Sequence, residues 1–196
     1  MANYAVNSLQ DGCYPGTAVL INTLNIRNQA DLDAVEGTIV PAKAALWEEK
    51  PLAGSFDFAH YCAIHRCLFE DLYEWAGKPR TVDISKKGTQ FCPAAQIEST
   101  AKAIFARLKK QNFLVDLDRA HFISAIVDFY ERTNELHPFR EGNGRTQRVF
   151  LSQLAHHAGY VIDFARVDPD DLMIATIQAA GGVDDFLKVL FDEMVV

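Results

Sequence analysis

Residues 137–148 read HPFREGNGRTQR, and the pattern on either side of them sets the fold of this 196-residue chain. The stretch combines a histidine, a glutamate, an asparagine and two glycines with three arginines. Glycine allows a tight turn that exposes backbone N–H groups, and arginine binds phosphate oxygens with two parallel hydrogen bonds. This combination predicts a loop that handles a phosphate compound.

The loop is expected to lie between two helices. Apolar residues recur at helical spacing over residues 118–136, with Asp118 as the expected N-cap, and Pro138 should end this helix. A second helix is predicted over residues 144–158, closed by Gly159. His137 is therefore expected where the first helix stops.

A helix that starts directly after a glycine turn is a ready anion site, because its first N–H groups and its dipole both favour negative charge. Arg145 and Arg148 are three residues apart, so they share one face of that helix and can bind one polyphosphate. Glu141 is better suited to Mg²⁺ than to direct phosphate contact. His137 is the nearby side chain with an ordinary pKa suited to accepting a proton at neutral pH.

The stretch resembles, position by position, the signature HxFx(D/E)GNGRxxR of the Fic family in the Fic/Doc superfamily. This resemblance implies a protein adenylyltransferase, which transfers AMP from ATP to a hydroxyl of a target protein and releases pyrophosphate. It further implies that His137 is the general base, that Glu141 holds Mg²⁺, and that the compact chain is similar to the toxin component of Fic toxin–antitoxin pairs.

The resemblance assigns most of the stretch to ATP binding. The expected residues are Arg140, Glu141, Gly142, Asn143, Gly144, Arg145, Thr146 and Arg148. Two of them have a second interpretation, because Arg140 is also expected to face solvent and Thr146 can serve either the site or the core. Phe139 is expected to be a buried anchor for the loop.

An upstream helix is predicted over residues 61–80, where Ile64, Leu68, Leu72 and Trp75 recur at helical spacing and Gly77 supplies a stop. It resembles the Fic pattern of an IHxxLF helix that closes in a WAG turn. A zinc site built from residues 60–67 is disfavoured, because its histidines and cysteines crowd one helix instead of forming spaced pairs.

Residues 81–92, TVDISKKGTQFC, are expected to form an isolated β-hairpin. Its unpaired edge can accept a partner strand through main-chain hydrogen bonds. In Fic proteins the corresponding element is a flap that aligns the target segment. The flap residues are then Ser85, Lys86, Lys87, Gly88, Thr89 and Gln90, and the competing interpretation is a solvated turn with ordinary surface lysines.

The remaining patterns predict helices over residues 31–47, 97–111, 168–180 and 183–195. The fold class is therefore all-α with one short hairpin flap over the active site. No repeat or linker interrupts the chain, so residues 1–196 are expected to form a single Fic domain with a core at about 55–160.

Bulk properties exclude several classes. A hydrophobic content of 49% supports one substantial core, and no segment is long and apolar enough to span a membrane. A net charge of −7 argues against binding nucleic acid through a broad basic surface. Four cysteines without framework spacing, and no classical signal peptide, favour a cytoplasmic protein, with non-classical delivery into a host left open.

A further expectation concerns control of activity. Many Fic proteins carry an inhibitory [S/T]xxxE(G/N) motif whose glutamate pairs with the second arginine of the signature, here Arg148. No glutamate of this chain has Ser or Thr four residues before it, and Glu36-Gly37 has Leu32 there instead. The resemblance therefore implies a small antitoxin-like partner that supplies this glutamate. The target protein can be bacterial or belong to a host.

Other activities stay open within the superfamily. Doc-like kinases transfer the γ-phosphate but resemble this stretch with Lys in place of its second glycine, here Gly144. Other relatives transfer UMP or phosphocholine. A catalytically silent binding scaffold is the alternative from a different class, although every reactive position of the signature is present.

Overall fold

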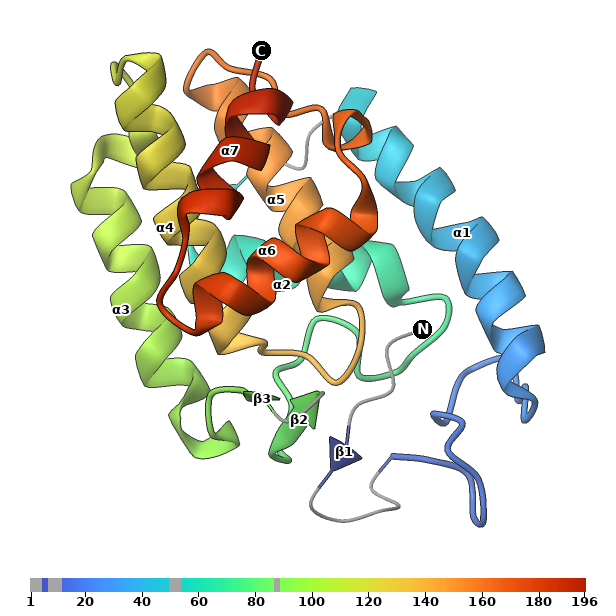
Figure 1. Ribbon diagram of the computed structural model, residues 1–196. Coiled ribbons are helices and arrows are strands. Elements are labelled where there is room, and N and C mark those ends of the chain that lie inside the picture. The colour runs from blue at the N-terminus through green and yellow to red at the C-terminus, as the bar shows by residue number, and fades with distance from the viewer. Residues whose placement is uncertain (1–4, 7–11, 50–53, 87–88) are drawn as a thin grey trace.

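The computed structural model describes residues 5–6, 12–49, 54–86 and 89–196. These residues are mainly helical, as the sequence predicts (Figure 1). The helices are α1 (Gln29–Glu49), α2 (Phe58–Phe69), α3 (Ile97–Lys110), α4 (Arg119–Leu136), α5 (Asn143–His157), α6 (Pro169–Ala180) and α7 (Asp185–Met194). Three short 3₁₀ turns join them at Ala94–Gln96, Asn112–Leu114 and Phe164–Arg166.

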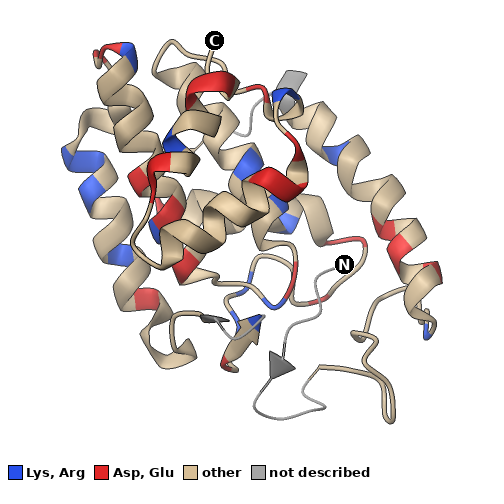
Figure 2. Cartoon of the chain, viewed as in Figure 1, with Lys and Arg blue, Asp and Glu red and all other residues tan. Residues whose placement is uncertain are grey.

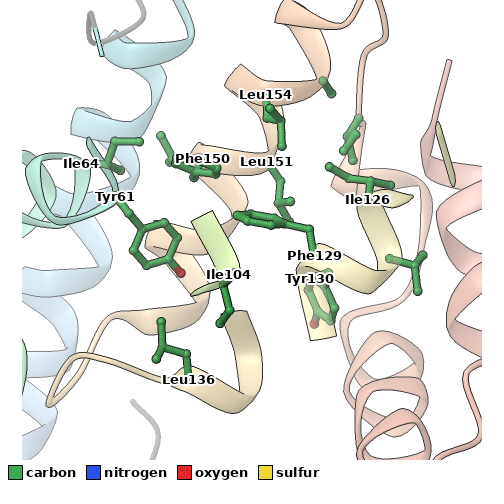
Figure 3. Packing of buried hydrophobic residues seen from close by; sticks show 14 of the residues in the cluster. Tyr61, Ile64, Ile104, Ile126, Phe129, Tyr130, Leu136, Phe150, Leu151 and Leu154 are labelled. Carbon is green, nitrogen blue, oxygen red and sulfur yellow. The ribbon is translucent and has the colours of Figure 1, made fainter. Parts of the chain in front are cut away.

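Helix α5 runs through the middle of the molecule and packs against α1, α2 and α4 (Figure 1). Helix α3 covers the outer side of α4, while α6 and α7 pack on each other and on α4. The core between these helices is rich in aromatic rings. Figure 3 shows Phe150 of α5 between Tyr61 of α2 and Phe129 of α4. Burial of this central surface fixes the position of the loop that enters α5.

The helix ends largely follow their sequence signals. The side chain of Asp118 caps α4 by accepting a hydrogen bond from the His121 amide, and Asp168 caps α6 in the same way. Gly159, with a φ of +88°, follows the end of α5 as expected. Local capping chemistry is therefore sufficient to locate these termini.

The prediction of one helix over residues 61–80 is wrong in its second half, because α2 ends at Phe69. Beyond it the chain turns, and the amides of Leu72 and Tyr73 both donate to the Phe69 carbonyl. Gly77 has a φ of +80° and lies against α2, where an added Cβ would stand 2.7 Å from the Cβ of Arg66. The glycine therefore serves the return of the chain onto α2 and not the end of a long helix.

The strands form a three-stranded antiparallel sheet in the order β1-β2-β3. Strand β2 (Ile84–Lys86) pairs with β3 (Thr89–Gln90) on one side and with β1 (Ala5–Val6) on the other. The expectation of an isolated two-stranded element is therefore wrong, since Ala5 lies opposite Ser85 and Val6 opposite Ile84. Lys87 and Gly88, the expected turn, lie outside the described residues.

No helix in the described ranges combines the length and hydropathy needed to cross a membrane. The same residues contain no group of three or more His, Cys, Asp or Glu arranged to hold a metal ion. Charged side chains of both signs are spread over the helices, and both occur in the loop before α5 (Figure 2).

Candidate active site

His137 lies at the end of α4, where the backbone adopts the left-handed conformation with a φ of 41°. Its ring is almost fully buried and stacks on Phe91, with centroids 3.8 Å apart. Nδ1 lies 3.0 Å from the Asn134 carbonyl, which can only accept, so Nδ1 carries the proton. This tautomer leaves Nε2 as the basic nitrogen of the ring.

Burial lowers the pKa of His137 to about 3, and the charges of Arg80 and Lys86 act in the same direction. The hydrogen bond to the Asn134 carbonyl opposes them. The ring is therefore neutral at physiological pH, which is the form that a general base requires. A polyanion bound nearby would raise this pKa toward neutrality, because negative charge favours the imidazolium.

The loop after His137 is held in shape by Asn143. The Asn143 side chain accepts from the Phe139 amide and donates to the Phe139 carbonyl, at 2.8 Å in both cases. Phe139 is fully buried, stacked on Tyr61 and on His65, which confirms the expected anchor. The Asn143 amide thus closes the loop, and the backbone is the part of this residue left to contact a ligand.

His65 of α2 fixes the position of Glu141. The Gly77 amide donates to Nδ1 of His65, so Nε2 carries the proton and donates to the Glu141 carbonyl at 3.0 Å. Burial lowers the pKa of His65 to about 3, so the ring stays neutral in this role. A buried, uncharged histidine with both nitrogens bonded is a rigid spacer between two backbone segments.

Gly142 forms the turn into α5 with a φ of +81°. Its backbone approaches Phe69 closely, because an added Cβ would stand 2.4 Å from two carbons of that ring. The helix that follows begins at Asn143, so its first N–H groups and the positive end of its dipole face the loop. This geometry is compatible with an anion site at the glycine turn, which stays a prediction.

The motif arginines differ in their surroundings. Arg145 Nη2 lies 3.2 Å from Oε1 of Glu141, and the Arg145 guanidinium lies over the ring of Phe69 at 4.8 Å. Arg148 is exposed and makes no ion pair with a described residue. Both arginines line the same cavity, as their spacing predicts. Arg145 is therefore held in place by carboxylates, whereas Arg148 is available to solvent.

Glu141 fits the requirements of a divalent cation. The carboxylate is buried, and the hydrogen bonds that it accepts from the Gly142 amide and from Arg145 both use Oε1, so Oε2 is the atom suited to a metal. Burial raises the pKa of Glu141, and the neighbouring carboxylate of Glu36 raises it further. A cation at this point would relieve the excess of negative charge, and one carboxylate with phosphate oxygens is typical for Mg²⁺.

A cavity of about 560 Å³ brings these groups together. Its lining includes His137, Glu141, Gly142, Gly144, Arg145 and Arg148. Lys86 of β2 and Phe91 border it on the sheet side, and Met173 and Ile177 of α6 form an apolar wall. A basic end next to an apolar wall can accommodate a phosphate chain attached to a flat base.

Three residues assigned to ATP do not line this cavity: Arg140, Asn143 and Thr146. Thr146 is fully buried, and its hydroxyl donates to the Gly142 carbonyl at 3.0 Å. Arg140 is half-buried instead of facing solvent, with Nη2 4.0 Å from the sulfur of Cys13. These side chains support the loop from behind.

Of the residues expected in the flap, some border the cavity and others do not. Lys86 borders the cavity, and it pairs with Thr89 across the two strands. Ser85 and Gln90 pair with each other and do not line the cavity. Lys87 and Gly88 are outside the described residues.

Arg80, which no sequence pattern marks as a site residue, joins the histidine to the sheet. Its Nε donates to the His137 carbonyl at 2.9 Å, and its two terminal nitrogens donate to the carbonyls of Val82 and Cys92. The Arg80 amide also donates to the Pro138 carbonyl. No local pattern marks such a residue, because its side-chain partners lie up to 57 positions away.

Comparison with known proteins identifies the family of this chain. The model of the Fic/DOC family matches residues 55–155, which include every motif residue named above. The chain is 41% identical to the protein adenylyltransferase VbhT of Bartonella schoenbuchensis, over 90% of this chain but 37% of that protein. It is 40% identical to the probable protein adenylyltransferase y4lH of Sinorhizobium fredii, over 90% of this chain and 91% of that protein.

The fold is also similar to that of a solved structure. The BepC protein of Bartonella tribocorum, crystallised with bound AMPPNP, superimposes with a TM-score of 0.88 at 28% identity. The match covers 95% of this chain and 97% of the BepC chain. That relative therefore binds an ATP analogue on the same fold.

Proposed function

The chain belongs to the Fic/DOC family of protein adenylyltransferases, and we propose that it transfers AMP from ATP to a Tyr, Thr or Ser hydroxyl of a target protein. The observation that supports this most is the neutral His137, whose Nδ1 is engaged by the Asn134 carbonyl beside the cavity that Arg145 and Arg148 line. We also propose that residues 1–196 act as one domain with a core at about 55–160.

In this reaction His137 Nε2 takes the proton of the target hydroxyl as its oxygen attacks the α-phosphorus. The bond from the α-phosphorus to the bridging oxygen breaks, and pyrophosphate leaves with that oxygen. The backbone of Gly142, Asn143 and Gly144 at the start of α5 faces the α-phosphate, and Arg145 and Arg148 bind the outer phosphates. Positioning and charge neutralisation supply most of the catalysis.

Glu141 would hold Mg²⁺ through its carboxylate. When bound, the cation neutralises phosphate charge and stabilises the departing pyrophosphate. The chain's own part is to keep the carboxylate in place, which the bond from His65 to the Glu141 carbonyl achieves. The apolar wall of α6 supports the opposite end of the nucleotide.

We propose that residues 85–90 align an extended target segment over His137, with Lys86 near the phosphates or the target. The pairing of β2 with β3 and the position of Lys86 at the cavity support it. Because β1 lies along the other edge of β2, a target strand that uses this edge must displace Ala5 and Val6.

Radioactive ATP tests the reaction. Incubation with a lysate and α-³²P-ATP should label protein, while γ-³²P-ATP should not, and His137→Ala should abolish the label. The matched control is His156→Ala, at an exposed position near the end of α5, which should keep full activity. Label from the γ-position alone would refute AMP transfer in favour of a kinase, and absence of label in every lysate would favour a scaffold. Labelled UTP or CDP-choline distinguishes transfer of UMP or phosphocholine.

Control by a separate partner is also proposed. We infer that a small antitoxin-like chain supplies a glutamate to Arg148, whose exposed guanidinium at the cavity is accessible to it. The purified chain should then label itself or a lysate without any activation. A silent wild type that becomes active on substitution of Arg148 would contradict this, because the restraint would lie within the chain.

A further inference from the structure

Arg145 lies between two buried carboxylates that are far apart in the sequence, Glu36 and Glu141. Its Nη1 is 2.5 Å from Oε1 of Glu36, and its Nη2 is 3.2 Å from Oε1 of Glu141. Glu36 is 3% exposed and Glu141 4% exposed. Glu36 belongs to α1 and precedes residues 55–155, which match the family model. One guanidinium therefore serves two acids, of which only one is part of the motif.

The two carboxylates face different surroundings. Glu141 lines the cavity, whereas Glu36 is not among its lining residues and reaches Arg145 from the α1 side. Glu36 is itself fixed, because Oε2 accepts a hydrogen bond from the Tyr73 hydroxyl at 2.8 Å. Tyr73 is 1% exposed and stacks on Trp75 with centroids 4.4 Å apart. Glu36 is thus a rigid contact on the core side of the arginine.

We propose that Glu36 is a positioning residue for AMP transfer: it holds Arg145 in the phosphate site when a magnesium ion on Glu141 draws the charge of that carboxylate away from Arg145. This inference rests on the proposed function. It assigns a role to a residue of α1 that lies outside the signature.

A cation on Oε2 of Glu141 weakens the attraction between that carboxylate and Arg145. Without Glu36 the half-buried guanidinium would depend on Glu141 alone, so Arg145 and the cation would compete for the charge of one carboxylate. With Glu36 in place, Arg145 retains one ion pair and its contact with the Phe69 ring. Glu141 can then serve a cation without disordering the arginine that binds the phosphates.

Two other roles of Glu36 would give different results when its charge is removed. If Glu36 restrained Arg145 away from the phosphates, removal of its charge would strengthen nucleotide binding at every Mg²⁺ concentration. If Glu36 only stabilised the packing of α1, its removal would lower the melting temperature and leave the Mg²⁺ requirement unchanged.

The test uses Glu36→Gln, which keeps the shape and removes the charge, and Tyr73→Phe, which removes the hydroxyl that orients Glu36. Binding of AMPPNP is measured by calorimetry over a series of Mg²⁺ concentrations, together with the melting temperature. Asp128→Asn is the matched control, since it removes a carboxylate that pairs with Arg107 and Arg132, away from the cavity.

We expect Glu36→Gln to raise the Mg²⁺ concentration for half-maximal AMPPNP binding about tenfold, because Arg145 loses one ion pair. Tyr73→Phe should raise it about threefold, because the charge remains and only its orientation suffers. Asp128→Asn should cause no shift. If Glu36→Gln fails to fold, the shift in Tyr73→Phe decides.

An unchanged or lower Mg²⁺ requirement in the folded variants would overturn the inference. The proposed function fails separately, when wild-type protein transfers no AMP from α-³²P-ATP. A wild type that binds AMPPNP and transfers AMP, next to a Glu36→Gln variant with the same Mg²⁺ dependence, refutes the role of Glu36 alone.

Discussion

The two buried histidines of the site make the stability of the fold depend on pH. Burial lowers the pKa values of His65 and His137 from 6.5 to about 3. Between these pH values the unfolded chain binds more protons than the folded one. The stability contributed by the two neutral histidines is therefore fully present above about pH 6.5 and is lost as the pH falls below it. Acid should therefore weaken the fold around the motif.

The size of this effect follows from the two pKa values. For one histidine with pKa values of 6.5 unfolded and about 3 folded, the free energy of unfolding falls by about 1.4 kcal/mol between about pH 7.5 and pH 5.5. The pair should cost about 2.7 kcal/mol over the same interval. Other titrating groups add to the total, so the contribution of one histidine is best isolated by a variant.

His137→Asn is the suitable variant. Asparagine tolerates the left-handed backbone of this position, and its amide N–H can replace the bond to the Asn134 carbonyl. Urea unfolding at the two pH values should show a pH-dependent loss that is smaller than in wild type by about 1.4 kcal/mol. Thr146→Val is the control, since it removes a buried hydroxyl without removing a titratable group. A variant that loses as much stability as wild type would refute the low pKa of His137.

Three further variants test other parts of the site. Gly142→Ala should destabilise the fold by about 2 kcal/mol or more, because its φ is +81° and the new Cβ would meet the Phe69 ring. Gly144→Ala is the control and should fold normally, because an added Cβ there meets nothing within 4 Å. Equal stability of the two variants in thermal melts would contradict this. Arg80→Met should lower the free energy of unfolding in urea by about 3 kcal/mol and lower kcat for AMP transfer, because buried carbonyls lose their donors. An unchanged kcat would show that the hydrogen bonds of Arg80 do not position His137. Val6→Pro removes an N–H from β1 and should speed target modification if targets pair with that edge of β2, whereas an unchanged rate excludes the edge as the docking site.

The sequence predicts the parts of the site that depend on local chemistry. The signature residues, the N-cap Asp118 and the stop at Pro138 each act on residues within a few positions of themselves, and the structure places α4, the turn and α5 accordingly. The same local reasoning extends the α2 helix too far. Apolar spacing continues past Phe69, but the turn there depends on Gly77 packing against α2, which spacing alone does not reveal.

What the sequence does not predict are contacts between distant segments. Arg80 and His65 look like ordinary residues of a turn and a helix, and neither has a neighbour in sequence that indicates its partner. The pairing of β1 with β2 is equally hidden, because two residues, Ala5 and Val6, carry too little pattern to predict a strand. Only the packed fold brings these segments together.

These distant contacts share one consequence, which is that the motif loop is held at its backbone. His65 fixes the carbonyl of Glu141, and Arg80 fixes the carbonyl of His137. Neither bond uses the groups that take part in the proposed reaction, so the proposed base and the carboxylate proposed to hold Mg²⁺ can change partners without moving the chain. A site that must exchange a proton and accept a triphosphate in a fixed geometry requires this separation between supporting and reacting atoms. Loss of a support should therefore lower kcat more than it weakens ATP binding, whereas loss of Arg148 should do the reverse.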